Sequence, residues 1–340
     1  MDIHTQVPLK NYTSMRLGGP AHFFVDIRNA EEIQEVYKNA KAKNIKCFIL
    51  GGGSNLIAHD EGFDGLILHI QIPGFTILAD DASTTTIKIG AGEIWDDAVK
   101  RTVEMNLSGI EAMSGIPGTA GATPIQNVGA YGQEIADTLI SLEAYDTKTE
   151  KFVELLNEQC EFSYRHSIFR GRESGRYIIT SITLKLYKSQ PSPPFYESLQ
   201  AYLDKNNITL YTHATIRDAV LAVRANKLPD VKKYASAGSF FKNALVEEWK
   251  YTELKAQFPE MPGYHMADGN YKIPTGWLIE QAGLKDQIFY GMRVYAGNAL
   301  VLINESATSY SDLVAARNTI IDKVRDTFQV IIEQEPLELA

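Results

Sequence analysis

The sequence predicts a protein of mixed α/β and α+β class that contains more than one domain. Two strand–helix alternations follow one another between residues 21 and 106, and a regular amphipathic helix follows Ser309. At 340 residues the chain is longer than one hydrophobic core usually serves. We expect boundaries near residues 70 and 215, which divide the chain into 1–70, 71–215 and 216–340.

The first range shows the pattern of a strand–helix–strand unit. AHFFVDI and KCFIL are short apolar runs, and the segment AEEIQEVYKNAKAKN between them carries its carboxylates early and its lysines late, as the helix dipole favours. The loop GGGSN and a further apolar run, DGLILHI, complete the range. The sequence therefore predicts strands at 21–27, 46–50 and 64–70 around one helix.

The second range begins as another such unit. TTTIKIGAG predicts a strand and EIWDDAVKRTVEMN an amphipathic helix, and a glycine-rich segment follows at 114–132. SLEAYDTKTEKFVEL indicates a hairpin that turns at DTKT, and RYIITSITLKLYK alternates like a half-buried strand.

The amino-acid composition changes at residues 189–195, before the third range begins. SQPSPPF has three prolines in seven residues, which forbids both a helix and a central strand, so this segment is a linker, an insertion or a lid. IRDAVLAVRANK opens the last region. Its final helix is predicted from apolar residues at spacings of three and four and from a capping box of Ser309 with Asp312. These apolar residues are Leu313, Ala316, Ile320, Val324 and Phe328.

Composition excludes several classes of protein. A net charge of −9 opposes a nucleic acid polyanion, so an anionic ligand must be held by local cations and backbone N–H groups. The chain has no basic start followed by an apolar run and no uninterrupted apolar stretch of about 18 residues, which predicts no membrane insertion and a cytoplasmic protein. The seven histidines are scattered, so we expect no metal. Cys47 and Cys160 are interpreted as buried or inert thiols.

Two glycine-rich loops are the candidate ligand sites. LGGGSN directly follows an apolar strand, and a backbone with so little side chain can approach a ligand closely or form an anion-binding turn; a tight surface turn is the alternative. It is neither GxGxxG nor a P-loop. A structureless stretch as long as 114–132 is uncommon in a compact enzyme unless it binds something. Together the loops could clasp the two halves of a dinucleotide.

Four motifs carry a family resemblance along essentially the whole chain. LGGGSNLI, IPGTAGATPIQNVGAYG, YRHSIF and AGSFFKN occur in an order that resembles the UDP-N-acetylenolpyruvoylglucosamine reductases, also called UDP-N-acetylmuramate dehydrogenases. The resemblance implies a two-lobed FAD-binding fold of the PCMH or vanillyl-alcohol oxidase type, with lobes at 1–70 and 71–215, and a substrate-binding α/β domain at 216–340. It further implies non-covalent FAD, NADPH as co-substrate, and a lid insertion near 189–200 as in the longer, type I members. We expect a monomer.

The reaction that the resemblance implies is reduction of an enolpyruvyl ether in peptidoglycan precursor synthesis. NADPH reduces FAD, the flavin N5 delivers hydride to the terminal vinyl carbon, and the protein must stabilise the resulting negative charge and protonate the other carbon. By resemblance, Arg165 and Glu335 stabilise this charge and Ser239 donates the proton. From the residues alone, Arg165 and Glu335 suit a solvated surface, and Ser239 suits a turn.

The remaining site residues are also implied by the resemblance. The cofactor-binding set is Leu50, Gly51, Gly52, Gly53, Ser54, Asn55, Ile116, Pro117, Gly118, Thr123, Gln126, Asn127, Gly129, Ala130 and Tyr131. The substrate-binding set is Tyr164, Tyr196, Lys227, Asn243, Tyr264, Lys272 and Asn298, with Tyr196 on the lid and Lys227 and Asn243 near the UDP diphosphate.

Two other functions remain open from the sequence. An FAD-dependent oxidase of the same superfamily would pass electrons to oxygen, and many such enzymes hold flavin covalently through a histidine at the first glycine loop, which FILGGGSN lacks. A non-catalytic UDP-sugar binding protein would not need two cofactor loops.

Overall fold

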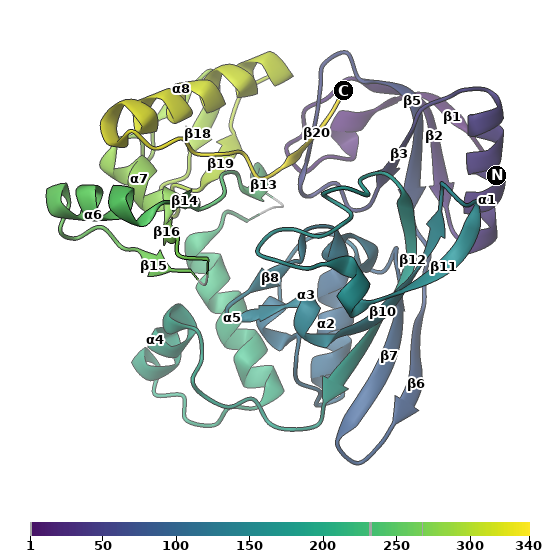
Figure 1. The fold of residues 1–340 in the computed structure, drawn as a ribbon, viewed down its shortest axis with the longest axis horizontal. Coiled ribbons are helices and arrows are strands. Elements are labelled where there is room, and N and C mark those ends of the chain that lie inside the picture. Colours follow the sequence, from purple (N-terminus) through teal and green to yellow (C-terminus); the bar gives the residue numbers. More distant parts are fainter. Residues whose placement is uncertain (1, 231–232, 267) are drawn as a thin grey trace. The chain divides into compact units, whose positions relative to one another are not determined.

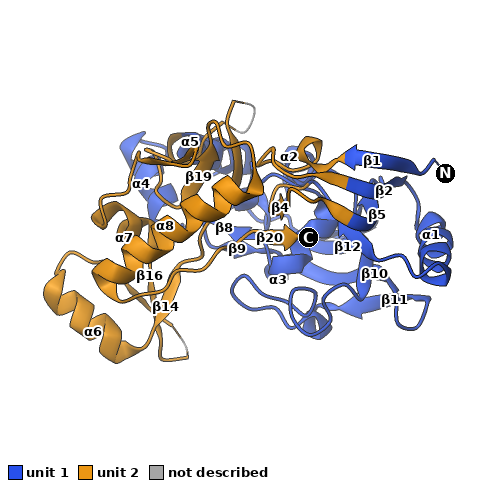
Figure 2. Ribbon diagram, turned by 90° about the horizontal axis from the view of Figure 1, so that it is seen from above, with its two compact units in different colours: residues 1–7, 21–52, 64–225 blue, residues 8–20, 53–63, 226–340 orange. Residues whose placement is uncertain are grey.

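The computed structural model describes residues 2–230, 233–266 and 268–340 (Figure 1). They form two compact units (Figure 2): the first contains residues up to 7, 21–52 and 64–225, and the second contains 8–20, 53–63 and 226–340. The predicted ranges 1–70, 71–215 and 216–340 do not coincide with these units. The difference arises because two early segments pack with the carboxyl-terminal part, where Met15, Leu17 and Ile57 enter its hydrophobic core.

The first unit holds two large sheets, one two-stranded sheet and most of the long strands. Its elements are β1 (His4–Pro8), β2 (Pro20–Ile27), α1 (Ala30–Ala42), β3 (Cys47–Leu50), β5 (Phe63–Ile70), β6 (Phe75–Asp80), β7 (Thr84–Gly90), α2 (Trp95–Glu104), η2 (Glu111–Met113), η3 (Ala120–Gln126), β8 (Gly129–Ala130), β9 (Gln133–Glu134), α3 (Ile135–Thr138), β10 (Leu139–Asp146), β11 (Lys151–Leu156), η4 (Asn157–Cys160), β12 (Tyr177–Tyr187), α4 (Glu197–Lys205) and α5 (His213–Lys227). One large sheet has the order β1-β2-β5-β3, with β3 parallel to β5. The other large sheet has the order β11-β10-β12-β7-β6 and is antiparallel throughout, and Figure 1 shows its long strands side by side.

One core joins both large sheets of the first unit to α1, α2 and α3. The predicted helix at 30–44 begins with a capping box between Asn29 and Glu32 and buries Ile33, Val36 and Ala40. These side chains share one cluster with Trp95 of α2 and with inward residues of both sheets. The predicted strands at 21–27, 46–50 and 64–70 and the hairpin around DTKT are confirmed.

The hairpin end of β10 contains a buried ion pair. Asp146, whose side chain is 3% exposed, accepts hydrogen bonds from Nε and Nη2 of Arg176, both at 2.8 Å. These bonds, with those from Lys148 N and Thr149 Oγ1, hold the pKa of Asp146 well below its ordinary value despite burial. The Asp146 carboxylate therefore stays ionised in the folded protein at pH values where the unfolded chain takes up a proton.

Acid stability is expected to depend on this pair. Because the folded-state pKa is depressed, its contribution is complete above the unfolded pKa of about 4 and is lost as the pH falls below that value. Urea unfolding from about pH 5 down to 2 should show a falling free energy of unfolding in the wild type and a flatter dependence in Arg176→Gln. Arg172→Gln is the control, since its bond to Glu161 lies on an exposed surface. An unchanged pH slope in Arg176→Gln would contradict this assignment.

The second unit is built around the predicted final helix. Its elements are η1 (Leu9–Asn11), β4 (Leu56–Ala58), β13 (Ala235–Ser239), β14 (Ala244–Val246), α6 (Glu248–Gln257), β15 (Tyr264–His265), β16 (Tyr271–Ile273), α7 (Thr275–Gln281), β17 (Ile288–Phe289), β18 (Met292–Val294), β19 (Val301–Asn304), α8 (Tyr310–Phe328) and β20 (Leu337–Leu339). The sheets have the orders β13-β19-β18-β17, β14-β16-β15 and β20-β4. The capping box of Ser309 with Asp312 is confirmed, and the five predicted apolar residues of α8 are all buried.

The proline-rich segment leads into a helix that the sequence analysis did not identify. After residues 189–195, α4 buries Leu199 and Leu203 against Ile216 and Val220 of α5. The segment is therefore part of a packed insertion in the first unit rather than a free linker. α5 begins at His213, three residues before the predicted start of the third range.

Two further expectations concern the cysteines and membrane-spanning helices. Cys160 is buried and Cys47 half-buried, and burial raises the pKa of Cys47 to about 11 and that of Cys160 to about 12, which disfavours the reactive thiolate. None of the helices in the described ranges is both long enough and apolar enough to cross a membrane.

Candidate active site

The first glycine loop packs so closely that side chains are excluded. Leu50 ends β3, and Gly51 and Gly52 remain in the first unit. A Cβ on Gly52 would lie 2.9 Å from the Cα atom of Gly118, and one on Gly51 would lie 2.8 Å from Thr119 Oγ1. The two glycine loops thus meet backbone to backbone within the first unit, and LGGGSN is not an isolated surface turn.

The rest of this loop belongs to the second unit. Gly53 has φ +60, and a Cβ there would lie 1.8 Å from the carbonyl oxygen of Tyr12. Only glycine fits both the backbone conformation and the space. The carbonyl oxygen of Ser54 accepts a hydrogen bond from Ser14 Oγ at 3.2 Å, and that of Asn55 accepts one from Leu337 N at 3.0 Å.

The second glycine segment is ordered rather than structureless. Thr123 is buried within η3 and donates from Oγ1 to Ala120 O at 2.7 Å. Gly129 and Ala130 form β8, which pairs with β9. Ile116 packs against the core of the first unit, and Gln126 Oε1 accepts a hydrogen bond from Arg170 at 2.5 Å. The sequence missed this order because the elements are only two to seven residues long.

Arg165 lies at the tip of a two-residue turn. Ser163 and His166 exchange two backbone hydrogen bonds of 3.1 Å, and Arg165 between them has φ +53. A non-glycine residue in this region is strained by roughly 1–2 kcal/mol and persists only where its surroundings hold it. The Arg165 Nη2 atom donates to Gly129 O at 3.0 Å, and its guanidinium lies 5.4 Å from the ring centroid of Tyr164.

Asn127 connects this turn to the second glycine segment. Its side chain is fully buried, with Nδ2 donating to Ser163 O at 3.2 Å and Oδ1 accepting from Ala136 N at 3.1 Å. Ser167 adds a third connection, from Oγ to Ile125 O at 2.6 Å. These bonds commit the Asn127 amide to holding the backbone, so we propose that it is a positioning residue for Arg165 rather than a cofactor contact.

Replacing Asn127 should therefore affect chemistry as well as stability. Asn127→Ala removes the acceptor of the Ala136 N–H and one of the two hydrogen bonds to Ser163 O, so we expect a loss of about 1–3 kcal/mol in the free energy of unfolding and a fall in kcat. Asn157→Ala is a matched control: its Nδ2 also makes two backbone bonds, to Ala136 O and Leu139 O, but none to the Arg165 turn. The control should lose stability while kcat stays within a few-fold. Equal falls in kcat would show that Asn127 acts only through general stability.

In the second unit, AGSFFKN forms a bulged strand end. The pairing of β13 with β19 is irregular between Ser236 and Ser239, and Gly238 between them has φ +71 with open space around a Cβ. Glycine is needed here for its backbone conformation, and such bulges re-aim the following side chain. Phe240 and Phe241 then enter the core, 0% and 2% exposed. Two buried rings thus fix the chain directly after Ser239.

The segment that carries Glu335 runs beside this strand end. Glu335 N donates to Phe240 O at 2.9 Å, and Lys242 N donates to Glu333 O at 2.9 Å. The Lys242 ammonium also pairs with the Glu333 carboxylate at 2.9 Å. Glu335 is therefore held one residue from Ser239 along this pairing, whereas the Glu333 carboxylate forms an ion pair with Lys242.

The expected substrate residues divide between the units. In the first unit, the Tyr196 ring lies edge-on to Tyr131 with centroids 6.0 Å apart, and burial raises the pKa of Tyr131 against an opposing effect of Arg224. Lys227, the last residue of α5, is exposed and belongs to the second unit.

The others lie in the second unit and several have structural bonds. Asn243 Oδ1 accepts from Thr275 N at 3.2 Å, and Asn298 Oδ1 accepts from Leu300 N at 3.1 Å. The Lys272 ammonium lies 5.8 Å from the ring centroid of Tyr264, its cross-strand neighbour.

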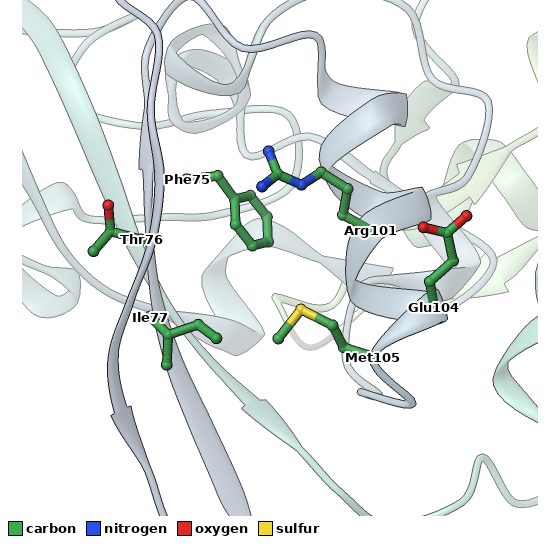
Figure 3. A pocket seen from close by; sticks show the side chains of 6 residues that line it. All are labelled: Phe75, Thr76, Ile77, Arg101, Glu104 and Met105. Carbon is green, nitrogen blue, oxygen red and sulfur yellow. The ribbon is translucent and has the colours of Figure 1, made fainter.

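A cavity of about 510 Å³ in the first unit contains none of the predicted site residues (Figure 3). Its lining residues are Phe75, Thr76, Ile77, Arg101, Glu104 and Met105. Arg101 stacks over the Phe75 ring at 3.8 Å, so its charge already has an aromatic partner. We do not assign the active site to this cavity.

Comparisons with known proteins match both halves of the chain. A family model described as an FAD binding domain matches residues 21–155, and one described as the C-terminal domain of UDP-N-acetylenolpyruvoylglucosamine reductase matches residues 230–338. A UDP-N-acetylenolpyruvoylglucosamine reductase from Flavobacterium johnsoniae is 38% identical over 98% of this chain and 99% of its own length. One from Ralstonia nicotianae is 38% identical over 97% of each chain. The crystal structure of the Thermus caldophilus enzyme aligns over 100% of both chains with a TM-score of 0.69 at 22% identity.

The fold and the matched domains define an FAD-dependent oxidoreductase, which confirms the predicted FAD-binding fold. The chain belongs to the UDP-N-acetylenolpyruvoylglucosamine reductase family. The residues present fit the cofactor, since both glycine loops lie within the matched FAD binding domain and the contact of Gly52 with Gly118 brings their backbones together there.

Proposed function

We propose that this protein reduces UDP-N-acetylglucosamine enolpyruvate to UDP-N-acetylmuramate with NADPH as the reductant, in peptidoglycan precursor synthesis. The supporting observation is kinship at 38% identity over nearly the full length of enzymes named for this reduction. Both substrates are nucleotides made inside cells, so we place the protein in the cytoplasm. We propose that it acts as a monomer.

Bound FAD supplies the hydride-transfer chemistry, and the chain supplies charge stabilisation and a proton. Hydride adds to the terminal vinyl carbon, and the electron pair of the double bond moves toward the carboxylate. We propose that the Arg165 fork, which donates to Gly129 O and lies on the turn that Asn127 holds at Ser163 O, binds this carboxylate.

The second hydrogen reaches the substrate as a proton. We propose that Ser239 donates it to the carbon that bears the ether oxygen, and that Glu335, held beside Phe240, aids the same charged state. Leu50 to Asn55 and the segment from Ile116 to Tyr131 are proposed to hold FAD, with the Asn127 side chain holding the backbone of that segment. The substrate contacts are proposed at Tyr164, Tyr196, Lys227, Asn243, Tyr264, Lys272 and Asn298.

Product analysis tests the proposed reaction. Purified protein supplied with NADPH and the enolpyruvyl sugar should oxidise one NADPH for each UDP-N-acetylmuramate formed, as measured by absorbance and mass spectrometry. The oxidase alternative predicts oxygen consumption instead, and the binding-protein alternative predicts no flavin band and no turnover. Denaturation should release all of the yellow colour, and colour retained on the chain would contradict non-covalent FAD.

A further inference from the structure

Arg224 is a partly buried cation that lies against the second glycine segment. A Cβ on Gly115, which has φ +72, would lie 3.2 Å from Arg224 Nε and 3.4 Å from its Cδ atom. The side chain therefore extends across the bare backbone of Gly115. Burial lowers the pKa of Arg224, against opposing effects of Tyr131 and Asp96, yet a guanidinium stays charged at neutral pH.

The neighbouring carboxylate is already occupied. Asp96 accepts two hydrogen bonds from Arg217, at 2.7 and 2.9 Å, and a third from Gly115 N at 2.6 Å. Over the described ranges, the Arg224 guanidinium has no hydrogen-bond acceptor and no ion-pair partner. Asp96 is thus paired with Arg217, and the charge of Arg224 leaves a net positive charge beside the glycine segment.

An unpaired cation in a partly buried position destabilises a protein unless an anion joins it. We propose that Arg224 is an anion subsite that is completed by a phosphate oxygen of a bound nucleotide. The planar guanidinium can bond two oxygens of one phosphate, and the absence of a side chain at Gly115 lets Arg224 lie directly against the backbone of the second glycine segment. This inference rests on the proposed function, because FAD and the UDP-sugar are the sources of phosphate. Gly115 belongs to the second glycine segment, which is proposed to hold FAD, so FAD is the favoured source of the phosphate.

Binding measurements on the FAD-loaded protein separate the two sources. We compare wild type with Arg224→Met, Arg224→Lys and the control Lys100→Met, which removes a charge from an exposed position on α2. Ultrafiltration gives the dissociation constant of FAD at several salt concentrations, and the change in the flavin spectrum gives that of UDP-N-acetylmuramate. Arg224→Met should weaken one of them about 10- to 100-fold and reduce its salt dependence, and Arg224→Lys should restore part of the loss.

Each outcome decides the matter. Weaker FAD binding alone assigns the phosphate to FAD, and weaker sugar binding alone assigns it to the substrate. If neither constant changes by more than about two-fold, or if Lys100→Met has the same effect, the subsite is wrong. Both readouts measure binding rather than turnover. If the wild type is inactive but its affinity for FAD or UDP-N-acetylmuramate depends on Arg224, the proposed reaction is refuted and the anion subsite is supported.

Thermal unfolding excludes a merely structural role. Arg224→Met should leave the melting temperature of FAD-depleted protein unchanged or higher, because it removes an unpaired cation, and should reduce the increase that added FAD or UDP-N-acetylmuramate produces. An equal decrease with and without these ligands would overturn the proposal. If Arg224→Met does not fold, the same comparison is made with Arg224→Lys, whose ammonium cannot bond two phosphate oxygens as a planar fork.

Discussion

Ser239→Ala is expected to slow reoxidation of the reduced flavin by the enolpyruvyl sugar about 10²- to 10⁴-fold, the usual contribution of a positioned acid. Reduction of the bound flavin by NADPH should stay within a few-fold of the wild type, because that step requires no proton on the sugar. The bulge at Gly238 and the buried rings of Phe240 and Phe241 hold the backbone in place without the hydroxyl. Anaerobic stopped-flow absorbance measures the two half-reactions separately.

Ser236→Ala is the matched control for this variant. Ser236 lies on the same strand, is 3% exposed, and pairs through its backbone with Ile303. Ser236→Ala should leave the rates of both half-reactions nearly unchanged. Equal slowing of both half-reactions in Ser239→Ala would contradict the proton-donor role and indicate a displaced site.

Arg165→Met is expected to slow the same reoxidation step about 10²- to 10³-fold through loss of charge stabilisation. Methionine keeps a Cβ atom, so the strained φ of +53 is not relieved and the turn between Ser163 and His166 is retained. Arg165→Lys keeps the charge but not the planar fork, and should recover only part of the rate. The measurement is again the reoxidation half-reaction over a range of sugar concentrations.

Arg172→Met controls for the loss of a nearby positive charge. The Arg172 side chain is 67% exposed and pairs with Glu161, so both half-reactions should remain normal. If turnover of Arg165→Met survives within a few-fold, another cation must face the substrate carboxylate, and Arg165 loses its proposed role.

The local elements were predictable because their signals are periodic. The helix after Ser309 has apolar residues at spacings of three and four and a capping box, and the structure contains both. The hairpin around DTKT combines two apolar runs with a turn, and β10 and β11 pair as predicted. The order of four motifs was sufficient for the family, which full-length relatives then confirmed.

Long-range packing was not predictable, because it depends on contacts between distant residues. β4 pairs in parallel with β20, in a register that joins Leu56 to Leu337, and no local signal indicates this. The same difficulty hid the role of Asn127, since its partners at Ser163 and Ala136 are visible only in the fold. Arg224 was missed because IRDAVLAVRANK predicts only a helix. The sequence does not show that Arg217, rather than Arg224, pairs with the Asp96 carboxylate.

The most direct measurement of the central claim is a two-step anaerobic experiment on the FAD-loaded protein. NADPH should bleach the visible flavin band, and the enolpyruvyl sugar, added without oxygen, should restore it while one UDP-N-acetylmuramate forms per flavin. A band that returns only when oxygen is admitted, with the sugar unchanged, would contradict the account.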